Sequence, residues 1–310
     1  MPAFHLHRPA PDPDVDLLDL IDAVQSVADG VLFGATYSLL GIGFTLIFGV
    51  MHKINLSYAA ASIGAAYASL LVMSVVEAPA VLAFVAAAAA GGVIGGLVYL
   101  VGFRFIPLAN PLATLMSTVG LLLLIDEIIV HATAGVPLSY PALFSDVIVQ
   151  VGPFGLRGDL MFVFALGCVC MTLLLLLLYR TRLGLATRAV SQQATASLLC
   201  GISTTQVNVL TFVITGVVGG IAGAMTGAAI GMLSPLLSLP LTVKGLIVTV
   251  IGGLGSIPGA IIAGLIVGGL ENAFQFFRGV SERDLYIMLL LFAFLVFRPG
   301  GIFAKSSGRD

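Results

Sequence analysis

The 310-residue chain is 59% hydrophobic and only 9% charged, whereas a soluble domain carries roughly 25% charged residues. This composition excludes a soluble protein, and the 37 glycines are typical of membrane helices that pack closely. The net charge of −2 gives no indication of nucleic-acid binding, and no basic run is suited to phosphate groups. We therefore expect a lipid membrane as a partner and no nucleic acid.

The N-terminal segment, residues 1–27, is polar, contains prolines and is rich in aspartate. We expect the first dozen residues to be disordered. Apolar residues at helical spacing over 15–27 are compatible with a short helix lying on the membrane surface. The segment lacks the apolar core of a signal peptide. We predict that residues 28–305 form a single transmembrane domain.

Apolar runs of about 20 residues predict membrane-spanning helices. Helical segments are expected at about 29–50, 55–76, 79–102, 111–131, 159–179, 207–231, 241–254, 257–277 and 284–304. The run from Pro240 to Phe277 is too long for one span and is interrupted by GGLGSIPG at 252–259. The sequence leaves open whether this broken segment crosses twice or is re-entrant. The predicted fold class is therefore an all-α polytopic membrane protein with about eight or nine spans.

Glycines at four-residue spacing predict close helix contacts in two of these spans. The 79–102 span has two overlaid pairs formed by Gly91, Gly92, Gly95 and Gly96, and the 207–231 span has six glycines. We expect a tightly packed neighbour helix along the 207–231 span.

The stretch from Arg180 to Gln206 separates two long apolar runs and carries three arginines. Ala186, Val190, Ala194 and Leu198 recur every four residues, so we predict one short, weakly amphipathic helix that ends at Gly201. Two interpretations remain open on these residues alone. The stretch is either a positively charged loop that fixes topology or a docking surface for a soluble partner.

The break at 252–259 is the best candidate for a translocation path, because lipid tolerates broken helices only where protein or water satisfies the freed backbone groups. The residues concerned are Gly252, Gly253, Gly255 and Ser256. The alternative is a passive kink caused by glycine and proline.

Polar residues within apolar runs are further path candidates. Lys244 either lines the path or extends its charge to the membrane surface. Asn55, Ser57 and Tyr58 either line the path or cap the second span. Asp126 and Glu127, like Glu271, lie either in a vestibule or at the outer interface.

Lysine and arginine counts suggest an orientation. If the 180–206 stretch is cytoplasmic and the chain crosses nine times, eight of the 13 Lys and Arg residues lie inside. The N-terminus is then outside and the C-terminus inside.

Enzyme signatures are absent. The glycine-rich GGLGSIPGA lacks the Lys-Ser/Thr ending of a P-loop, so we do not expect this chain to hydrolyse ATP. The three cysteines and four histidines lack metal-ligand spacing, and we expect neither a metal site nor a cofactor.

At this point the motifs resemble a known family. The stretch from Gly184 to Ile202, GLATRAVSQQATASLLCGI, is similar to the cytoplasmic coupling segment of branched-chain amino acid ABC transporter permeases of the LivH type. Three further stretches, 37–58, 244–259 and 297–303, also resemble motifs of that family, and the resemblance covers about 30–304. An acid that the family carries near Gln193 is missing.

The resemblance implies that this chain is one transmembrane subunit of an importer in a bacterial inner membrane. Its partners would be a second homologous permease, two cytoplasmic ATPases that hold ATP and Mg, and an extracytoplasmic substrate-binding protein. The implied ATPase-coupling residues are Gly184, Arg188, Ala189, Gln192, Gln193, Ala196 and Gly201.

One departure bears on the substrate. Where the family has I-N-F-A-H-G, this chain has INLSYA at 54–59, with Tyr58 and Ala59 in place of histidine and glycine. Branched-chain amino acids are the first candidate substrate, and urea, short amides or other small polar solutes are alternatives. A secondary transporter working alone is the alternative from another class, and a membrane enzyme is a third.

Overall fold

The computed structural model describes residues 13–75, 80–106, 111–141, 143–144, 147–151, 154–298 and 300–303, so the predicted disorder of the first dozen residues lies outside it. The helices are α1 (Pro13–Met51), α2 (Tyr58–Val75), α3 (Val81–Gly102), α4 (Pro111–Thr133), α5 (Gly158–Arg180), α6 (Arg182–Gln192), α7 (Ala194–Leu199), α8 (Thr204–Ile230), α9 (Ser238–Gly252), α10 (Ile257–Arg278) and α11 (Val280–Phe297). Within these ranges, seven helices are long and apolar enough to cross a membrane, and α2 is a shorter apolar helix. The predicted all-α polytopic fold is confirmed.

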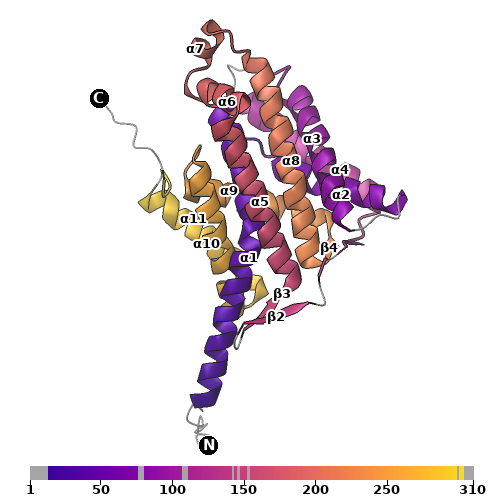
Figure 1. Ribbon diagram of the computed structural model, residues 1–310, viewed down its shortest axis with the longest axis vertical. Coiled ribbons are helices and arrows are strands. Elements are labelled where there is room, and N and C mark those ends of the chain that lie inside the picture. The colour runs from indigo at the N-terminus through magenta and orange to yellow at the C-terminus, as the bar shows by residue number, and fades with distance from the viewer. Residues whose placement is uncertain are drawn as a thin grey trace, which may run out of the picture.

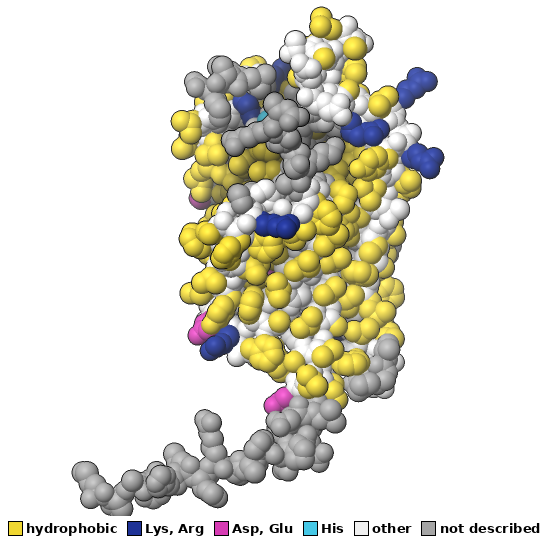
Figure 2. Space-filling view, turned by 90° about the vertical axis from the view of Figure 1, so that its left-hand side faces the viewer, with side chains coloured by type: hydrophobic (Ala, Val, Ile, Leu, Met, Phe, Trp, Pro, Cys, Tyr) yellow, Lys and Arg dark blue, Asp and Glu magenta, His cyan; other side chains and the backbone are white. Residues whose placement is uncertain are grey.

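The bundle has two distinct ends (Figure 1). α6 and α7 lie at one end, which we call the α6 end, and the N-terminal part of α1 projects from the other, which we call the opposite end. A face seen in Figure 2 is covered largely by hydrophobic side chains, with most of its Lys and Arg side chains toward the α6 end. This distribution is that of a helix bundle whose sides face lipid.

α1 is longer than the sequence predicted. Instead of a separate surface helix over 15–27 followed by a span, one helix of 39 residues runs through Met51 without a break, a length of about 58 Å at 1.5 Å per residue. Its first half has partners at the opposite end: Gln25 Nε2 donates to Gly155 O (3.0 Å), and Ser26 Oγ donates to Asn272 O (3.1 Å). No proline or glycine falls between Asp14 and Asp29, so nothing local interrupts the helix.

The second half of α1 is the centre of the bundle. Between Ala35 and Ile47 every residue is buried, because α10, α8, α5 and α9 all pack against this part of the helix. α10 is antiparallel to α1 and comes close at glycines, and Ser38 Oγ donates to Ile261 O (2.8 Å) across this contact. A helix that is apolar all round suits such a buried position.

α3 and α8 make a second close contact. Gly91 and Gly95 of α3 lie against Gly216 and Gly220 of α8, and a Cβ added at any of the four would meet the backbone of the other helix. This confirms the tight neighbour predicted for the 207–231 span and identifies it as α3.

Short strands close the opposite end. β1 (Leu138–Ser139) pairs with β4 (Met232–Leu233), and β2 (Ile148–Val151) pairs with β3 (Phe154–Arg157). Tyr140, next to β1, is buried, and its hydroxyl lies 3.1 Å from Ser69 Oγ. Burial raises the pKa of the Tyr140 phenol to about 12, so the hydroxyl keeps its proton for this hydrogen bond at neutral pH.

The predicted break is present. α9 ends at Gly252 and α10 begins at Ile257, and Gly255 in the intervening turn lies beside Gly49, near the C-terminal end of α1. α9 therefore runs from the opposite end toward the α6 end, and α10 returns. α11 then runs back toward the α6 end, since Ile302 N–H, just beyond it, donates to Ile251 O (2.8 Å) at the end of α9.

Candidate functional site

The predicted coupling stretch forms two helices rather than one. Gln193 has extended backbone angles (φ −157°, ψ 103°) that end α6, and α7 begins at the next residue. Ala194 and Leu198 therefore do not continue the face begun by Ala186 and Val190, which corrects the single-helix prediction. The four-residue spacing was real, but spacing alone does not reveal a change of helix axis.

Local capping fixes both ends of this unit. Thr181 Oγ1 accepts a hydrogen bond from Gly184 N–H (3.2 Å) at the start of α6. Gly201 ends α7 as predicted, in the left-handed conformation (φ 82°) with Gly201 N–H donating to Leu198 O (3.0 Å). Glycine is the residue that adopts this angle without a steric cost.

α6 buries one face and exposes the other. Gly184, Thr187 and Val190 are buried, and a Cβ at Gly184 would meet the backbone of Leu178 in α5. Gly184 is therefore a packing residue that lets α6 lie directly on the end of α5. The exposed side carries Arg188, whose guanidinium lies 5.2 Å from the centre of the Tyr179 ring.

α7 presents an apolar surface to its surroundings. Leu199 is 86% exposed and Leu198 is 54% exposed, and Ala196 is also exposed. Of the six residues of α7 only Ser197 is buried. Exposed leucines on a short helix at the end of the molecule are characteristic of a surface that a protein partner covers.

A cavity of about 460 Å³ at the α6 end joins two sets of predicted residues. Arg188 and Gln192 of α6 line one side, and Gly255 and Ser256 of the α9–α10 break line another. The end of α1 contributes Thr45, which is 1% exposed and whose Oγ1 has no hydrogen-bond partner among the described residues. The coupling helix and the break are thus parts of one site, a relation that the sequence did not predict.

The backbone of the break is held from two sides. A Cβ on Gly252 would lie 2.5 Å from the Gly259 carbonyl carbon, and one on Gly301 would lie 2.5 Å from Gly253 Cα. Gly253 itself has φ 98°, a value that other residues adopt only with strain. The C-terminal motif at 297–303 therefore closes over the break, and Phe303 reaches the 460 Å³ cavity.

Asn55, Ser57 and Tyr58 lie elsewhere, in the interior between α1, α3 and α8. Asn55 Oδ1 accepts hydrogen bonds from Ser57 N–H (3.2 Å) and Ser57 Oγ (2.8 Å), an Asx turn that leads into α2. The link before it is held by Lys53, whose Nζ donates to Thr114 Oγ1 (2.7 Å). Desolvation lowers the pKa of the Lys53 amine.

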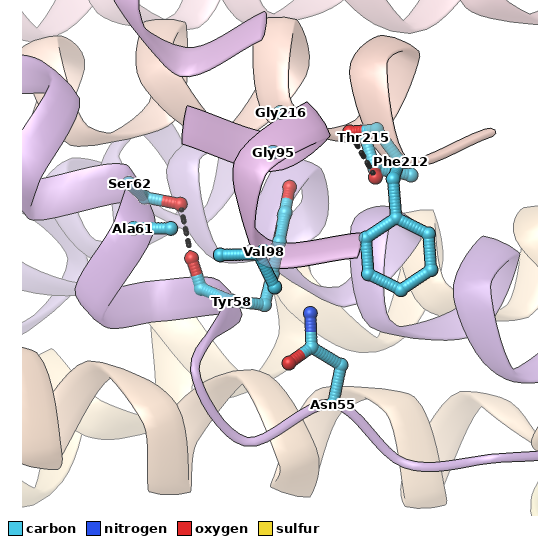
Figure 3. A pocket seen from close by; sticks show the side chains of 9 residues that line it. All are labelled: Asn55, Tyr58, Ala61, Ser62, Gly95, Val98, Phe212, Thr215 and Gly216. Carbon is cyan, nitrogen blue, oxygen red and sulfur yellow. Dashed lines mark hydrogen bonds between the residues drawn. The ribbon is translucent and has the colours of Figure 1, made fainter. Parts of the chain in front are cut away.

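A small cavity of about 10 Å³ lies beside these residues, lined among others by Asn55, Tyr58, Phe212 and Thr215. In Figure 3 the Asn55 amide points toward Val98 and Phe212. This volume holds about one water molecule, so in this conformation the region is closed to a solute.

The Tyr58 ring fills the space between α1 and α8. It packs edge-on to Phe44 (centroids 5.1 Å apart), and a Cβ added at Gly43 or Gly219 would meet the ring. Its hydroxyl is buried and has no hydrogen-bond partner among the described residues. The tyrosine at position 58, where the family motif has histidine, thus places a large side chain at a point where three helices meet.

Lys244 does not extend to the membrane surface. Its side chain is 10% exposed, and its Nζ donates to Glu271 Oε1 (2.6 Å) and Tyr37 Oη (3.3 Å). Asp284 Oδ1 lies 3.4 Å from the same nitrogen, and Arg283 Nε lies 3.2 Å from Glu271 Oε1. A buried amine and carboxylate that pair in this way avoid most of the cost of leaving water.

The acidic pair of α4 divides between two environments. The Glu127 carboxylate is exposed and lies 3.1 Å from His131 Nδ1. Asp126 Oδ1 is buried and has no hydrogen-bond partner among the described residues. Neighbouring acids on one helix therefore include one surface residue and one that faces the bundle.

The predicted path residues thus occupy three places: the break at the α6 end, the interior beside Tyr58, and the Lys244 ion cluster toward the opposite end. Sequence reasoning did not identify four residues at the break at the α6 end: Gly301, Phe303, Thr45 and Tyr179. Only the FRPGGIF motif at 297–303 carried a signal, because a glycine pair after a proline indicates a tight turn.

Comparisons with known proteins identify relatives over nearly the whole chain. Residues 26–297 match the profile of a family described as branched-chain amino acid transport system/permease component. The high-affinity branched-chain amino acid transport system permease protein LivH of Escherichia coli (strain K12) is 26% identical over 294 residues, which cover 91% of this chain and 96% of that protein. The corresponding protein BraD of Pseudomonas aeruginosa is 27% identical over 295 residues, with the same two coverages.

Proposed function

We propose that this chain, which belongs to the family of permease components of branched-chain amino acid transport systems, imports its substrate with energy from ATP hydrolysed on separate subunits. Family membership confirms the resemblance seen in the motifs and makes the chain a transport permease subunit. The energy source, the direction of transport and the set of partners are the proposal.

The proposed partners are a second homologous permease, two ATPases that hold ATP and Mg, and a substrate-binding protein; this chain itself binds no cofactor. We place the α6 end in the cytoplasm of a bacterial cell and the opposite end outside. The basic residues support this orientation. Lys53, Arg104, Arg180, Arg182, Arg188 and Arg298 lie toward the α6 end, against Arg157, Lys244, Arg278 and Arg283 toward the opposite end.

One observation carries the mechanism: α6 and the α9–α10 break line the same cavity. An ATPase bound to the exposed surface of α7 and the outer face of α6 would shift α6 as it closes on ATP. Because Arg188 and Ser256 line the same cavity, that shift would change the shape of the space beside the break. α1, which contributes Thr45, would transmit the change to the centre of the bundle.

The substrate proposal follows from the relatives, whose names specify branched-chain amino acids. Because this chain has Tyr58 where the family has histidine, urea, short amides and other small polar solutes are the alternative substrates. Ligand screening on the partner binding protein decides between them, because high-affinity selection is expected in that protein.

The coupling role is tested by Arg188→Glu in a reconstituted transporter. We expect ATP hydrolysis stimulated by loaded binding protein to fall, and uptake to fall further, while the variant still assembles in the membrane. The matched control is Arg182→Glu, which makes the same charge change on the same helix but does not line the cavity. Unchanged uptake and unchanged stimulation in Arg188→Glu would contradict the coupling role.

A transporter working alone is the competing function. The two are separated by uptake into proteoliposomes that contain this chain without ATPases. Solute accumulation there, driven by an ion gradient, would refute the proposal, whereas strict dependence on ATP and the partner subunits supports it.

A further inference from the structure

A second cavity, of about 160 Å³, lies between α9 and α11 toward the opposite end. Its walls are aliphatic: Leu239, Pro240, Val243 and Ile247 from α9, and Ile287 and Met288 from α11. Lys244 and Asp284 complete its lining, and Lys244 Nζ lies 3.4 Å from Asp284 Oδ1. The cavity therefore combines an apolar wall with one positive and one negative group.

The charges around this cavity balance. Lys244 and Arg283 are the cations of the cluster, and Glu271 and Asp284 are the anions. A neutral cluster inside a membrane protein favours neither a free anion nor a free cation. It is suited to a ligand that carries both charges and has no net charge.

One member of the cluster has a polar atom without a hydrogen-bond partner. Glu271 is 4% exposed, and its Oε2 has no hydrogen-bond partner among the described residues. Buried polar atoms without partners are uncommon in folded proteins and call for an explanation. Asp284 is the freest group, because its side chain is 52% exposed and its two ion-pair contacts are both 3.4 Å long.

We propose that this cavity binds a zwitterionic amino acid with an aliphatic side chain, its carboxylate on Lys244 and its ammonium on Asp284. The aliphatic side chain lies against Val243, Ile247 and Met288. The proposal rests on the proposed function of an importer. In that function the 160 Å³ cavity receives the amino acid from the binding protein, and the cavity at the α6 end opens afterwards.

Size and charge together favour a free amino acid over a lipid. The volume, about 160 Å³, is below the roughly 300–1,000 Å³ of pockets that take drug-sized ligands, which suits one small molecule rather than the acyl chains of a phospholipid. A zwitterionic lipid headgroup shares the charge pattern, so the experiment includes a lipid arm.

The test uses the complete transporter in nanodiscs and the variant Asp284→Asn, which keeps the shape of a half-exposed side chain and removes its charge. Binding of L-leucine, 4-methylpentanoate and L-leucinamide is measured without ATP or binding protein. 4-Methylpentanoate lacks the ammonium, and L-leucinamide lacks the carboxylate. We expect the wild type to bind leucine more tightly than 4-methylpentanoate by about tenfold or more, and also more tightly than L-leucinamide. Asp284→Asn is expected to bind leucine and 4-methylpentanoate equally, and still to bind leucine more tightly than L-leucinamide.

Two matched controls separate binding from folding. Glu282→Gln removes an acid from the same turn of α11 that does not line the cavity, and is expected to leave the preference intact. Met288→Phe fills the cavity and is expected to abolish leucine binding. Its neighbour Leu289→Phe, also exposed but outside the cavity lining, is expected to bind leucine as the wild type does.

An unchanged preference in Asp284→Asn, or equal leucine binding in Met288→Phe and Leu289→Phe, overturns the site. Loss of leucine binding when phosphatidylethanolamine replaces phosphatidylcholine in the nanodisc also overturns it, because a lipid then occupies the cavity. ATP-dependent uptake by the wild type is measured separately. Its absence would refute the proposed function, whereas normal uptake in Asp284→Asn with unchanged ligand preference would refute only this site.

Discussion

The contact between α3 and α8 allows a quantitative test of the packing. Replacing Gly216 by alanine adds one methyl group at the point where the two backbones meet. The ideal Cβ would lie 3.0 Å from the Gly91 carbonyl carbon and 3.1 Å from Gly95 Cα, with the Gly91 oxygen closer still. Carbon atoms attract each other best at about 3.5–4.0 Å, so the helices must separate locally by roughly half an ångström or more.

The steric cost can be isolated with a control. Gly120 of α4 has no atom within 4 Å of its ideal Cβ, so Gly120→Ala adds the same methyl group to a helix without a clash. Both variants gain the same improvement in helix propensity, about 0.5–1 kcal/mol. The difference between them is therefore the overpacking cost, for which we expect about 1–3 kcal/mol.

Thermal unfolding of the purified protein in detergent measures this difference. Gly216→Ala is expected to unfold at a temperature a few degrees below Gly120→Ala. Equal midpoints would show that α3 and α8 are not in close contact at Gly216, which would refute the packing described for these two helices.

Three further predictions concern the ion cluster, the break and α7. Lys244→Met is expected to destabilise the protein by about 3 kcal/mol, the low end for breaking a buried pair, because Glu271 loses its nearest cation and keeps only Arg283. The double variant with Glu271→Leu should recover most of that loss, and a double variant as unstable as the single one would contradict the pairing. Gly253→Leu should lower both folded yield and uptake, because of its φ of 98° and its contact with Gly301, whereas normal uptake would indicate a passive kink. Leu199→Glu should weaken ATPase binding in a pull-down without changing membrane insertion, since Leu199 is 86% exposed; undiminished ATPase capture would exclude α7 from the interface.

The sequence predicted much of the fold, because membrane spans and their interruptions are local properties. Apolar runs placed most of the bundle helices to within a few residues, and GGLGSIPG marked the break that separates α9 from α10. The last helix, predicted at 284–304, is α11 at Val280–Phe297. The N-terminal part of α1 was predicted as a separate surface helix because its polar, acidic residues precede the apolar run. The continuation of α1 depends on partners such as Gly155 and Asn272, which lie far away in the chain.

The candidate sites were less predictable. The 180–206 stretch was correctly singled out as a distinct unit between two spans, yet its division at Gln193 follows from backbone angles that no residue pattern revealed. Lys244 was correctly singled out as unusual, but its environment was not, because Glu271 and Asp284 reach it from two later helices.

By itself the sequence determined the membrane class, the approximate spans, the glycine-rich contacts and the family resemblance, since each depends on residues near one another in the chain. Only the tertiary structure decided which of these features act together. It placed Arg188 on the same cavity as the 253–256 break, closed Gly301 over Gly253, and enclosed Lys244 between two carboxylates. The physical reason is that the energy of a buried charge or of a close backbone contact is set by the neighbouring helices, and those neighbours are chosen by packing rather than by local pattern.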